Sequence, residues 1–179
     1  MAEHKILIAG GGTGGHLFPA LAIGEEIHHR EPGAKIHYVG SNFGLEAKVF
    51  PVKDVWHTLL PIRGFQRGIS LQSLGRNSLL PVRIIRSMLK IRSLMNEFLP
   101  QVVVGTGGYA SALPLYMASK KNNPLPIILQ EQNSYPGMTT RWFADKAKTI
   151  CVAFNDANTH LESDTVLTGN PVRHGIADG

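Results

Sequence analysis

The sequence predicts an α/β fold, a Rossmann-like parallel sheet with helices on both faces. Short apolar runs, of the kind that a strand buried on both faces requires, alternate with segments of helical periodicity along the whole chain. Glycine-rich turns follow two of these runs, at residues 10–15 and 105–108, and each turn leads straight into a helical segment. Strands that alternate with helices form right-handed βαβ units, and such units build a parallel sheet.

The first expected strand comprises the apolar residues 6–9, and the first helix covers 17–29 with Pro19 in its first turn, where a missing N–H costs little. A long helix covers 79–98, again with a proline, Pro81, in its first turn. The other expected elements are strands at 35–39, 55–60, 101–104, 127–129, within 144–153 and at 165–167, a short helix at 45–50, and a basic, Gly-rich loop at 63–70.

The composition is that of a globular protein with a sizeable core, because 43% of the 179 residues are hydrophobic. Cys151 is the single cysteine, so an internal disulfide is excluded and a reducing, cytoplasmic compartment is expected. No apolar run is long enough for a membrane span, and the first one does not resemble a signal peptide. The net charge of +5 indicates an anionic partner, whether phosphate, a lipid surface or nucleic acid.

The strongest local signal is the glycine loop at residues 10–15. Free backbone N–H groups at a helix start, together with the helix dipole, bind phosphate or another anion. Gly10, Gly12 and Gly15 satisfy the dinucleotide fingerprint, but residues 40–42, after the second strand, contain no carboxylate to hold a ribose. No Walker lysine follows the glycines either. An anion or nucleotide-sugar site is favoured over NAD, and a tight turn without a ligand is the alternative.

The Gly-Thr-Gly-Gly of residues 12–15 returns letter for letter at 105–108. Ligands bind beyond the carboxyl ends of parallel strands, so both loops and the polar segment 130–133 are expected to line one crevice. His16 follows the first loop at the helix start, where the dipole favours a neutral imidazole that accepts a proton or binds a ligand. A capping or packing role is the alternative for this histidine.

Other polar residues near the crevice have two interpretations. Glu131 and Asn133 lie just past a buried strand and either face a ligand or cap the next helix. Tyr109 either stacks on a ligand or fills space. The sequence has no cluster with metal-ligand spacing, no Asp-x-Asp pair and no Gly-x-Ser-x-Gly elbow, so metal-dependent and covalent mechanisms are not supported.

The helix at 79–98 lies in a stretch, 55–96, that holds seven Lys and Arg residues and no acidic residue. One face of its helical wheel is expected to meet the core: Leu80, Ile84, Met88, Ile91 and Met95. The nearly opposite face carries an apolar stripe with basic flanks: Val82, Ile85 and Leu89, with Arg83, Arg86 and Lys90. Such a face suits an anionic membrane surface. Nucleic acid is not expected, because few aromatic residues are available for stacking, and a helix packed on two sides is the alternative.

Four motifs together resemble the bacterial N-acetylglucosaminyltransferases that convert lipid I to lipid II in peptidoglycan synthesis. They are Gly-Gly-Thr-Gly-Gly-His at 11–16, Gly-Thr-Gly-Gly-Tyr-Ala-Ser at 105–111, Glu-Gln-Asn at 131–133 and Gly-Asn-Pro-Val-Arg at 169–173. The resemblance covers essentially the whole chain. It implies the N-terminal half of an inverting, two-domain GT-B enzyme that needs no cofactor and no metal. Residues 1–167 are then expected to form the acceptor domain, and 168–179 to begin the linker to a donor domain.

The resemblance also implies substrates and site residues. The full-length enzyme would move GlcNAc from UDP-GlcNAc to an undecaprenyl-diphosphate-linked acceptor, at the cytoplasmic face of the inner membrane as a peripheral protein; this chain alone is expected to be inactive. The catalytic candidates are Glu131 and His16, and His16 is either the base for the acceptor hydroxyl or a ligand of the diphosphate. The expected contacts are Thr13, Gly14, Gly15, Asn133 and Arg173 with UDP-GlcNAc, and Gly107, Gly108, Tyr109 and Gln132 with the acceptor diphosphate.

Two further readings stay open, a GT-B enzyme for another lipid acceptor and a non-catalytic nucleotide- or anion-binding module. The chain also departs from the family at one position. The family often has histidine before Glu-Gln-Asn, whereas this chain has Gln130, which favours His16 as the base.

Overall fold

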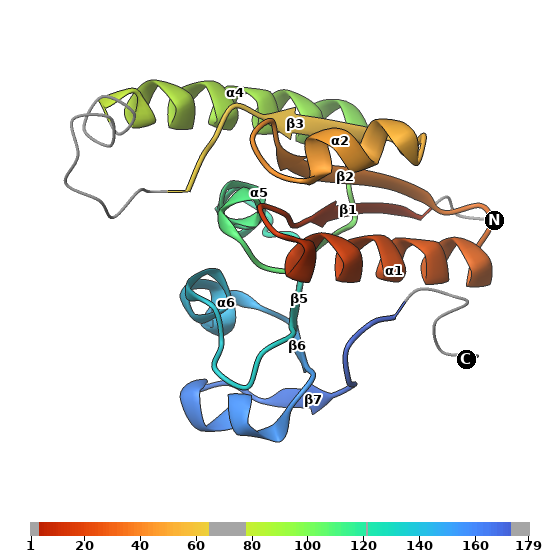
Figure 1. Cartoon of the computed structure of the whole chain (residues 1–179), viewed down its shortest axis with the longest axis vertical. Helices are drawn as coiled ribbons and strands as arrows, with labels where there is room; N and C mark the ends of the chain where they lie inside the picture. The colour runs from red at the N-terminus through yellow and green to blue at the C-terminus, as the bar shows by residue number, and fades with distance from the viewer. Residues whose placement is uncertain (1–3, 65–77, 121, 173–179) are drawn as a thin grey trace.

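The computed structural model describes residues 4–64, 78–120 and 122–172 of the chain. Within these residues one sheet of seven parallel strands has the order β3-β2-β1-β4-β5-β6-β7 (Figure 1). The strands are β1 (Lys5–Ala9), β2 (Lys35–Ser41), β3 (His57–Leu60), β4 (Val102–Gly105), β5 (Ile127–Glu131), β6 (Thr149–Val152) and β7 (Thr165–Leu167). The predicted Rossmann-like parallel sheet is confirmed.

Helices cover both faces of the sheet, as expected. The helical elements are α1 (Gly14–Arg30), α2 (Glu46–Val52), α4 (Leu80–Phe98), α5 (Tyr109–Ser119) and α6 (Met138–Phe143), with 3₁₀ turns η1 (Ala144–Lys146) and η2 (Asn155–His160). Side chains of β1 alternate between two cores: Leu7 and Ala9 pack with α4, α5 and α6, whereas Ile8 packs with α1 and α2. Because both faces of β1 are buried, its sequence is a continuous apolar run rather than an alternating pattern.

The first helix begins three residues earlier than the sequence predicts. Thr13 has extended backbone angles and serves as the N-cap residue, and its carbonyl accepts from the N–H of Leu17 at 3.1 Å. Gly14 and Gly15 therefore belong to the first turn of α1. The expectation that Pro19 lies in that turn is wrong, because Pro19 falls in the second turn, where it cannot donate to the carbonyl of Gly15.

Other boundaries shift by one or two residues. Strand β2 runs on through Ser41, because it pairs with β3 as far as the Ser41–Leu60 register. Strand β3 begins at His57 and α2 at Glu46, and α4 starts with Pro81 in its first turn as expected. The predicted loop at 63–70 lies outside the described residues beyond Gly64.

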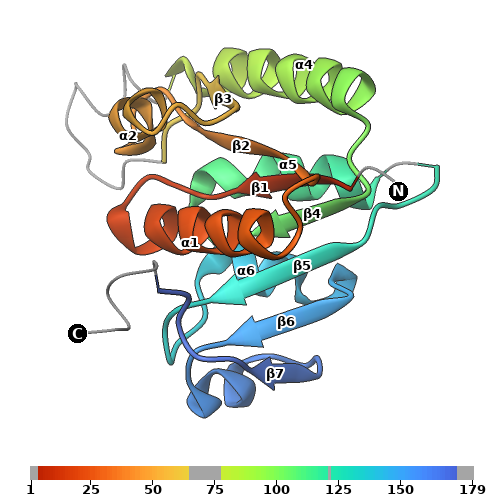
Figure 2. The same cartoon turned by 90° about the vertical axis from the view of Figure 1, so that its right-hand side faces the viewer.

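The strand order reverses at β1, which pairs with β2 on one side and β4 on the other. Figure 2 shows β1 and β4 side by side, with Ala9 and Gly105 as register partners near their carboxyl ends. The two glycine loops leave the sheet from these ends and touch, since a Cβ added to Gly108 would lie 2.1 Å from the carbonyl oxygen of Gly11. Ligands of open α/β sheets bind at such a switch point.

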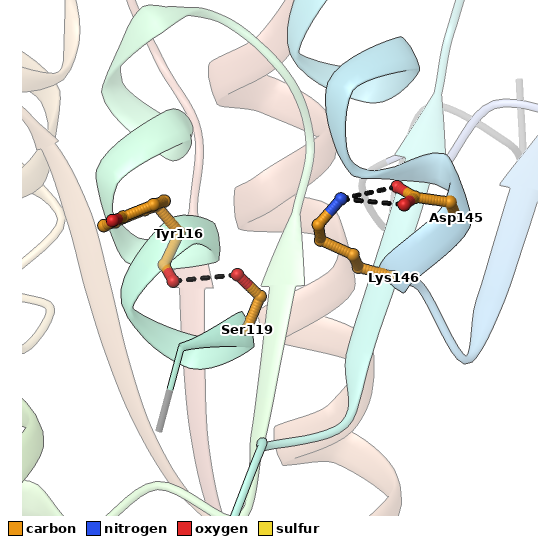
Figure 3. Close-up of polar contacts among 4 residues, drawn as sticks. All are labelled: Tyr116, Ser119, Asp145 and Lys146. Atoms are coloured by element: carbon orange, nitrogen blue, oxygen red, sulfur yellow. Dashed lines mark hydrogen bonds and ion pairs between the residues drawn. The ribbon is translucent and has the colours of Figure 1, made fainter. Parts of the chain in front are cut away.

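Polar contacts on the surface contribute little to holding the helices on the sheet. At the end of α5 the Ser119 hydroxyl donates to the carbonyl of Tyr116 at 2.9 Å, and in η1 the Lys146 ammonium lies 2.8 Å from both carboxylate oxygens of Asp145 (Figure 3). Hydrogen bonding from Lys146 lowers the pKa of the Asp145 carboxyl. Exposed ion pairs stabilise proteins only slightly, so apolar packing keeps α5 and α6 in place.

The pH dependence of stability should report on His37, which lies on β2 and packs beside the rings of Trp56 and Phe98. Burial lowers the pKa of His37 from 6.5 to about 4, and the neighbouring His57 acts in the same direction. As the pH falls from 6.5 to about 4, the unfolded chain takes up a proton here that the folded chain does not, so the free energy of unfolding decreases. Urea midpoints at pH 7 and pH 4.5 should differ less in His37→Gln than in the unchanged protein. An equal difference in both would contradict this assignment.

The contact between the glycine loops predicts a large cost for a methyl group at Gly108. Gly108 and Gly169 have nearly the same positive φ, +77° and +76°, but a Cβ on Gly169 would have no neighbour within 4 Å. Gly169→Ala isolates backbone strain and should destabilise the fold by about 1 kcal/mol. Gly108→Ala adds the clash with Gly11 and should cost about 3 kcal/mol or more. Urea unfolding measures both, and equal destabilisation would show that the loops do not touch.

Candidate functional site

The two glycine loops are joined by reciprocal hydrogen bonds between His16 and Thr106. The Thr106 hydroxyl, fully buried, donates to the backbone carbonyl of His16 at 2.8 Å. In return, Nδ1 of His16 lies 3.0 Å from the carbonyl oxygen of Thr106. Gly10 leaves room for this contact, because a Cβ there would overlap the Thr106 hydroxyl. Thr106 thus fixes both the backbone and the ring of His16.

The surroundings of His16 define which ring nitrogen carries the proton. Nδ1 also lies 2.9 Å from Oε1 of Gln132, whose Nε2 donates to the carbonyls of Thr106 and Gln130 at 2.8 and 3.0 Å. Both neighbours of Nδ1 are acceptors, so Nδ1 bears the hydrogen. In the neutral ring, Nε2 is then the atom that accepts a proton or a hydrogen bond.

Glu46 is a buried carboxylate at the first glycine loop that the sequence did not indicate. Its carboxylate is fully buried and accepts the N–H of Gly12 at 3.1 and 2.9 Å and the N–H of Ser41 at 2.7 Å. A dinucleotide site has its carboxylate directly after the second strand, whereas Glu46 reaches the loop from the start of α2. A glutamate is rarely fully buried without partners, and nothing in the sequence indicated that its partners are a glycine loop.

The backbone N–H groups at the start of α1 are the part of the predicted anion site that Glu46 does not occupy. Among the described residues, none accepts a hydrogen bond from the N–H of Thr13, Gly14 or Gly15. Thr13 and Gly15 are exposed and Gly14 is half-buried. The positive end of the helix dipole lies at these N–H groups, which keeps them suited to a phosphate group.

Glu131 organises the loop that follows β5. Its Oε1 accepts the N–H and the side-chain amide of Asn133 at 3.1 and 2.8 Å, and its Oε2 accepts the N–H of Gly137 and the hydroxyl of Thr140 at 2.9 and 2.6 Å. The residue is 2% exposed. Four hydrogen bonds to one buried carboxylate hold the loop in one conformation.

An apolar cavity of about 460 Å³ opens beside His16. Its walls come from α4, α5 and α6: Leu80, Ile84, Tyr109, Ala112, Leu113, Met138 and Trp142. Gly107, Gly108, Glu131 and Arg63 also line it. The Tyr109 ring packs on the first loop as well, since a Cβ on Gly12 would lie 2.8 Å from it. Tyr109 therefore fills the space between the loops and faces the cavity at the same time.

The expected outward stripe of α4 is exposed, with Val82, Ile85 and Leu89 at 47, 58 and 62%. Its predicted core face includes Ile91 and Met95, which are buried. The three basic residues beside the stripe have different surroundings. Arg86 is exposed, whereas Lys90 donates to the carbonyl of Leu59 at 2.8 Å and the Arg83 guanidinium lies over the Phe43 ring. No helix in the described part of the chain is long and apolar enough to cross a bilayer.

Some of the predicted site residues lie together in the structure and others do not. His16, Gly107, Gly108, Tyr109 and Gln132 meet around the two loops. Asn133 is exposed and its amide is bound to Glu131, and Arg173 lies outside the described residues.

Comparison with known proteins places the chain in a family. The model of the glycosyltransferase family 28 N-terminal domain matches residues 6–152. A relative from Flavobacterium psychrophilum is 40% identical over 98% of this chain and 47% of its own length, and one from Bacteroides thetaiotaomicron is 42% identical over 97% and 45%. Both are named UDP-N-acetylglucosamine--N-acetylmuramyl-(pentapeptide) pyrophosphoryl-undecaprenol N-acetylglucosamine transferase. The chain spans about half the length of the curated relatives it matches.

Solved structures share the fold. MurG of Acinetobacter baumannii superposes with a TM-score of 0.73 at 24% identity, over 98% of this chain and 47% of that one. A UDP-N-acetylglucosamine 2-epimerase homologue from Listeria monocytogenes gives a TM-score of 0.58 at 14% identity, over 95% of this chain and 46% of that one. The family model covers most of the sheet and both glycine loops, and the chain therefore belongs to glycosyltransferase family 28, whose N-terminal domain it contains.

Proposed function

We propose that this chain is the acceptor-side domain of an inverting glycosyltransferase. The full-length enzyme moves GlcNAc from UDP-GlcNAc to an undecaprenyl-diphosphate-linked muramoyl acceptor, lipid I, and so makes lipid II. Residues 1–167 form this domain, and 168–179 lead toward the donor side. The names of the relatives support the substrates. The observation that carries the proposal is the His16 ring, held by Thr106 and Gln132 at the edge of an apolar cavity.

The reaction is a single displacement. Nε2 of His16 takes the proton of the acceptor hydroxyl as that oxygen attacks the anomeric carbon of GlcNAc, and the bond from this carbon to UDP breaks. The imidazolium that forms keeps its Nδ1–H on the carbonyl of Thr106 and on Gln132. These two acceptors stabilise the positive charge and hold the ring orientation.

The remaining polar groups bind rather than transfer protons. The free N–H groups of Thr13, Gly14 and Gly15 bind a phosphate of the donor or acceptor, and Gly107 and Gly108 leave space for the acceptor beside His16. Asn133 and Arg173 serve the sugar nucleotide. Glu131, with its four hydrogen bonds, positions the loop that carries Gln132 and Asn133.

The enzyme works as a peripheral protein on the cytoplasmic face of the inner membrane. The exposed stripe of Val82, Ile85 and Leu89 enters the anionic lipid surface, and Arg86 at its edge meets the headgroups. Leu80 and Ile84 of the same helix line the cavity beside His16, so a lipid-linked acceptor reaches the site without leaving the surface.

Replacing His16 tests the catalytic assignment. His16→Ala in the full-length enzyme should lower kcat by roughly 100-fold or more, because the acceptor hydroxyl loses its base. His28→Ala, an exposed histidine near the other end of α1, is the matched control and should leave kcat unchanged. Steady-state transfer from UDP-GlcNAc to a short-chain lipid I analogue measures both. An unchanged kcat in His16→Ala would remove this residue as the base.

Replacing the exposed stripe tests the membrane assignment. The double variant Ile85→Ser, Leu89→Ser should reduce binding of the chain to phosphatidylglycerol vesicles about tenfold, since two apolar side chains no longer enter the bilayer surface. Val52→Ser removes a side chain on α2 that is 87% exposed and should not change binding. Vesicle sedimentation gives the partition coefficients. Equal binding of all three proteins would contradict a membrane role for this face.

A further inference from the structure

Two arginines, one of which lines the cavity, share one aromatic ring. The guanidinium carbon of Arg63 lies 4.1 Å from the centroid of the Phe43 ring, and that of Arg83 lies 5.2 Å from it. The three residues come from separate segments: Phe43 from the loop between β2 and α2, Arg63 from the residues after β3, and Arg83 from α4. The tertiary fold, rather than local sequence, brings them together.

The positive charges of this cluster have no acidic partner in the described chain. The ring of Phe43 is the contact of both guanidinium groups. Residues 55–96 contain no Asp or Glu, and the carboxylate of Glu46 is occupied by the N–H groups of Gly12 and Ser41. A guanidinium on an aromatic ring keeps its N–H edge free to donate, so the cluster presents two donor forks that no acceptor in the described part of the chain occupies.

The position of the cluster connects the cavity with the exposed face of α4. Arg63 lines the same apolar cavity as His16. Arg83 is half-buried and lies between the exposed Val82 and the cavity-lining Ile84. An anion bound here would lie where the cavity meets the stripe that we assign to the lipid surface.

We propose that Arg63 and Arg83, supported by Phe43, bind a phosphate-bearing anion. Guanidinium groups pair with phosphate oxygens through two parallel N–H donors, and a bound anion removes the repulsion between two like charges on one ring. The proposal rests on the proposed function for the source of the phosphate, which is either the diphosphate of the lipid-linked acceptor or the phosphodiester of a membrane lipid.

Titration with inorganic pyrophosphate tests the cluster in solution, without lipid. Arg63→Gln, Arg83→Gln and Phe43→Leu should each weaken pyrophosphate binding about tenfold, as expected when one charge-assisted contact is lost. Phe43→Leu is the decisive variant, because it removes the ring and leaves the net charge of the chain unchanged. Arg92→Gln is the matched control: Arg92 is an exposed residue elsewhere on α4, and its replacement should leave the affinity within twofold of the unchanged protein.

A second arm separates the two sources of phosphate. Binding to phosphatidylglycerol vesicles is measured for the same four variants. Loss of pyrophosphate binding in Arg63→Gln and Phe43→Leu identifies a diphosphate site. Undetectable pyrophosphate binding, with vesicle binding lost in these two variants but kept in Arg92→Gln, identifies a phospholipid headgroup site. If both variants bind pyrophosphate and vesicles like the unchanged protein, the proposal is overturned.

Failure of this proposal is distinguishable from failure of the proposed function. The pyrophosphate titration needs no sugar donor and no glycosyl transfer, whereas the effect of His16→Ala on kcat does not involve the arginine cluster. A full loss of kcat in His16→Ala together with unchanged anion binding in Phe43→Leu would support the transferase function and contradict the anion site at the arginine cluster.

Discussion

The site depends on the hydrogen bonds that join His16 and Thr106 across the switch point of the sheet. Strands β1 and β4 are neighbours because the chain returns to the centre of the sheet after β3, and their carboxyl ends bring two glycine loops into contact. Glycine is needed at this contact, since a side chain on Gly10 would overlap Thr106 and one on Gly108 would overlap the carbonyl of Gly11. Only with the loops this close can one threonine hold both the backbone and the ring of the histidine.

A second constraint is the internal carboxylate of Glu46. Glycine loops at this place in other α/β proteins present their N–H groups to a nucleotide phosphate. Here Gly12 donates to Glu46 instead, and a phosphate at the same point would meet a buried negative charge. The N–H groups of the first helical turn, next to His16, are those of this loop that have no acceptor among the described residues.

The sequence was sufficient to predict the sheet, its parallel direction and the helices on both faces, because apolar runs and glycine-rich turns are local signals. It was also sufficient for the approach of the two loops, which follows from the carboxyl-end rule. It could not predict the start of α1 at Gly14, since glycines are poor helix formers and the turn is held by Thr13 and Thr106. Nor could it predict Glu46 under Gly12 or the meeting of Phe43, Arg63 and Arg83, because these contacts join residues from different crossover units.

Pro19 gives the start of α1 an unusual mechanical character. A proline in the second turn removes one backbone hydrogen bond between the turn that carries His16 and the rest of the helix. The hydroxyl of Thr106 donates a hydrogen bond to the carbonyl of His16 and so connects that turn to the end of β4. His16 is therefore hydrogen-bonded to the residue after β4 through both its ring and its carbonyl, as well as being part of α1. A displacement of Thr106 is therefore expected to reach the imidazole through these two hydrogen bonds, without passing along α1.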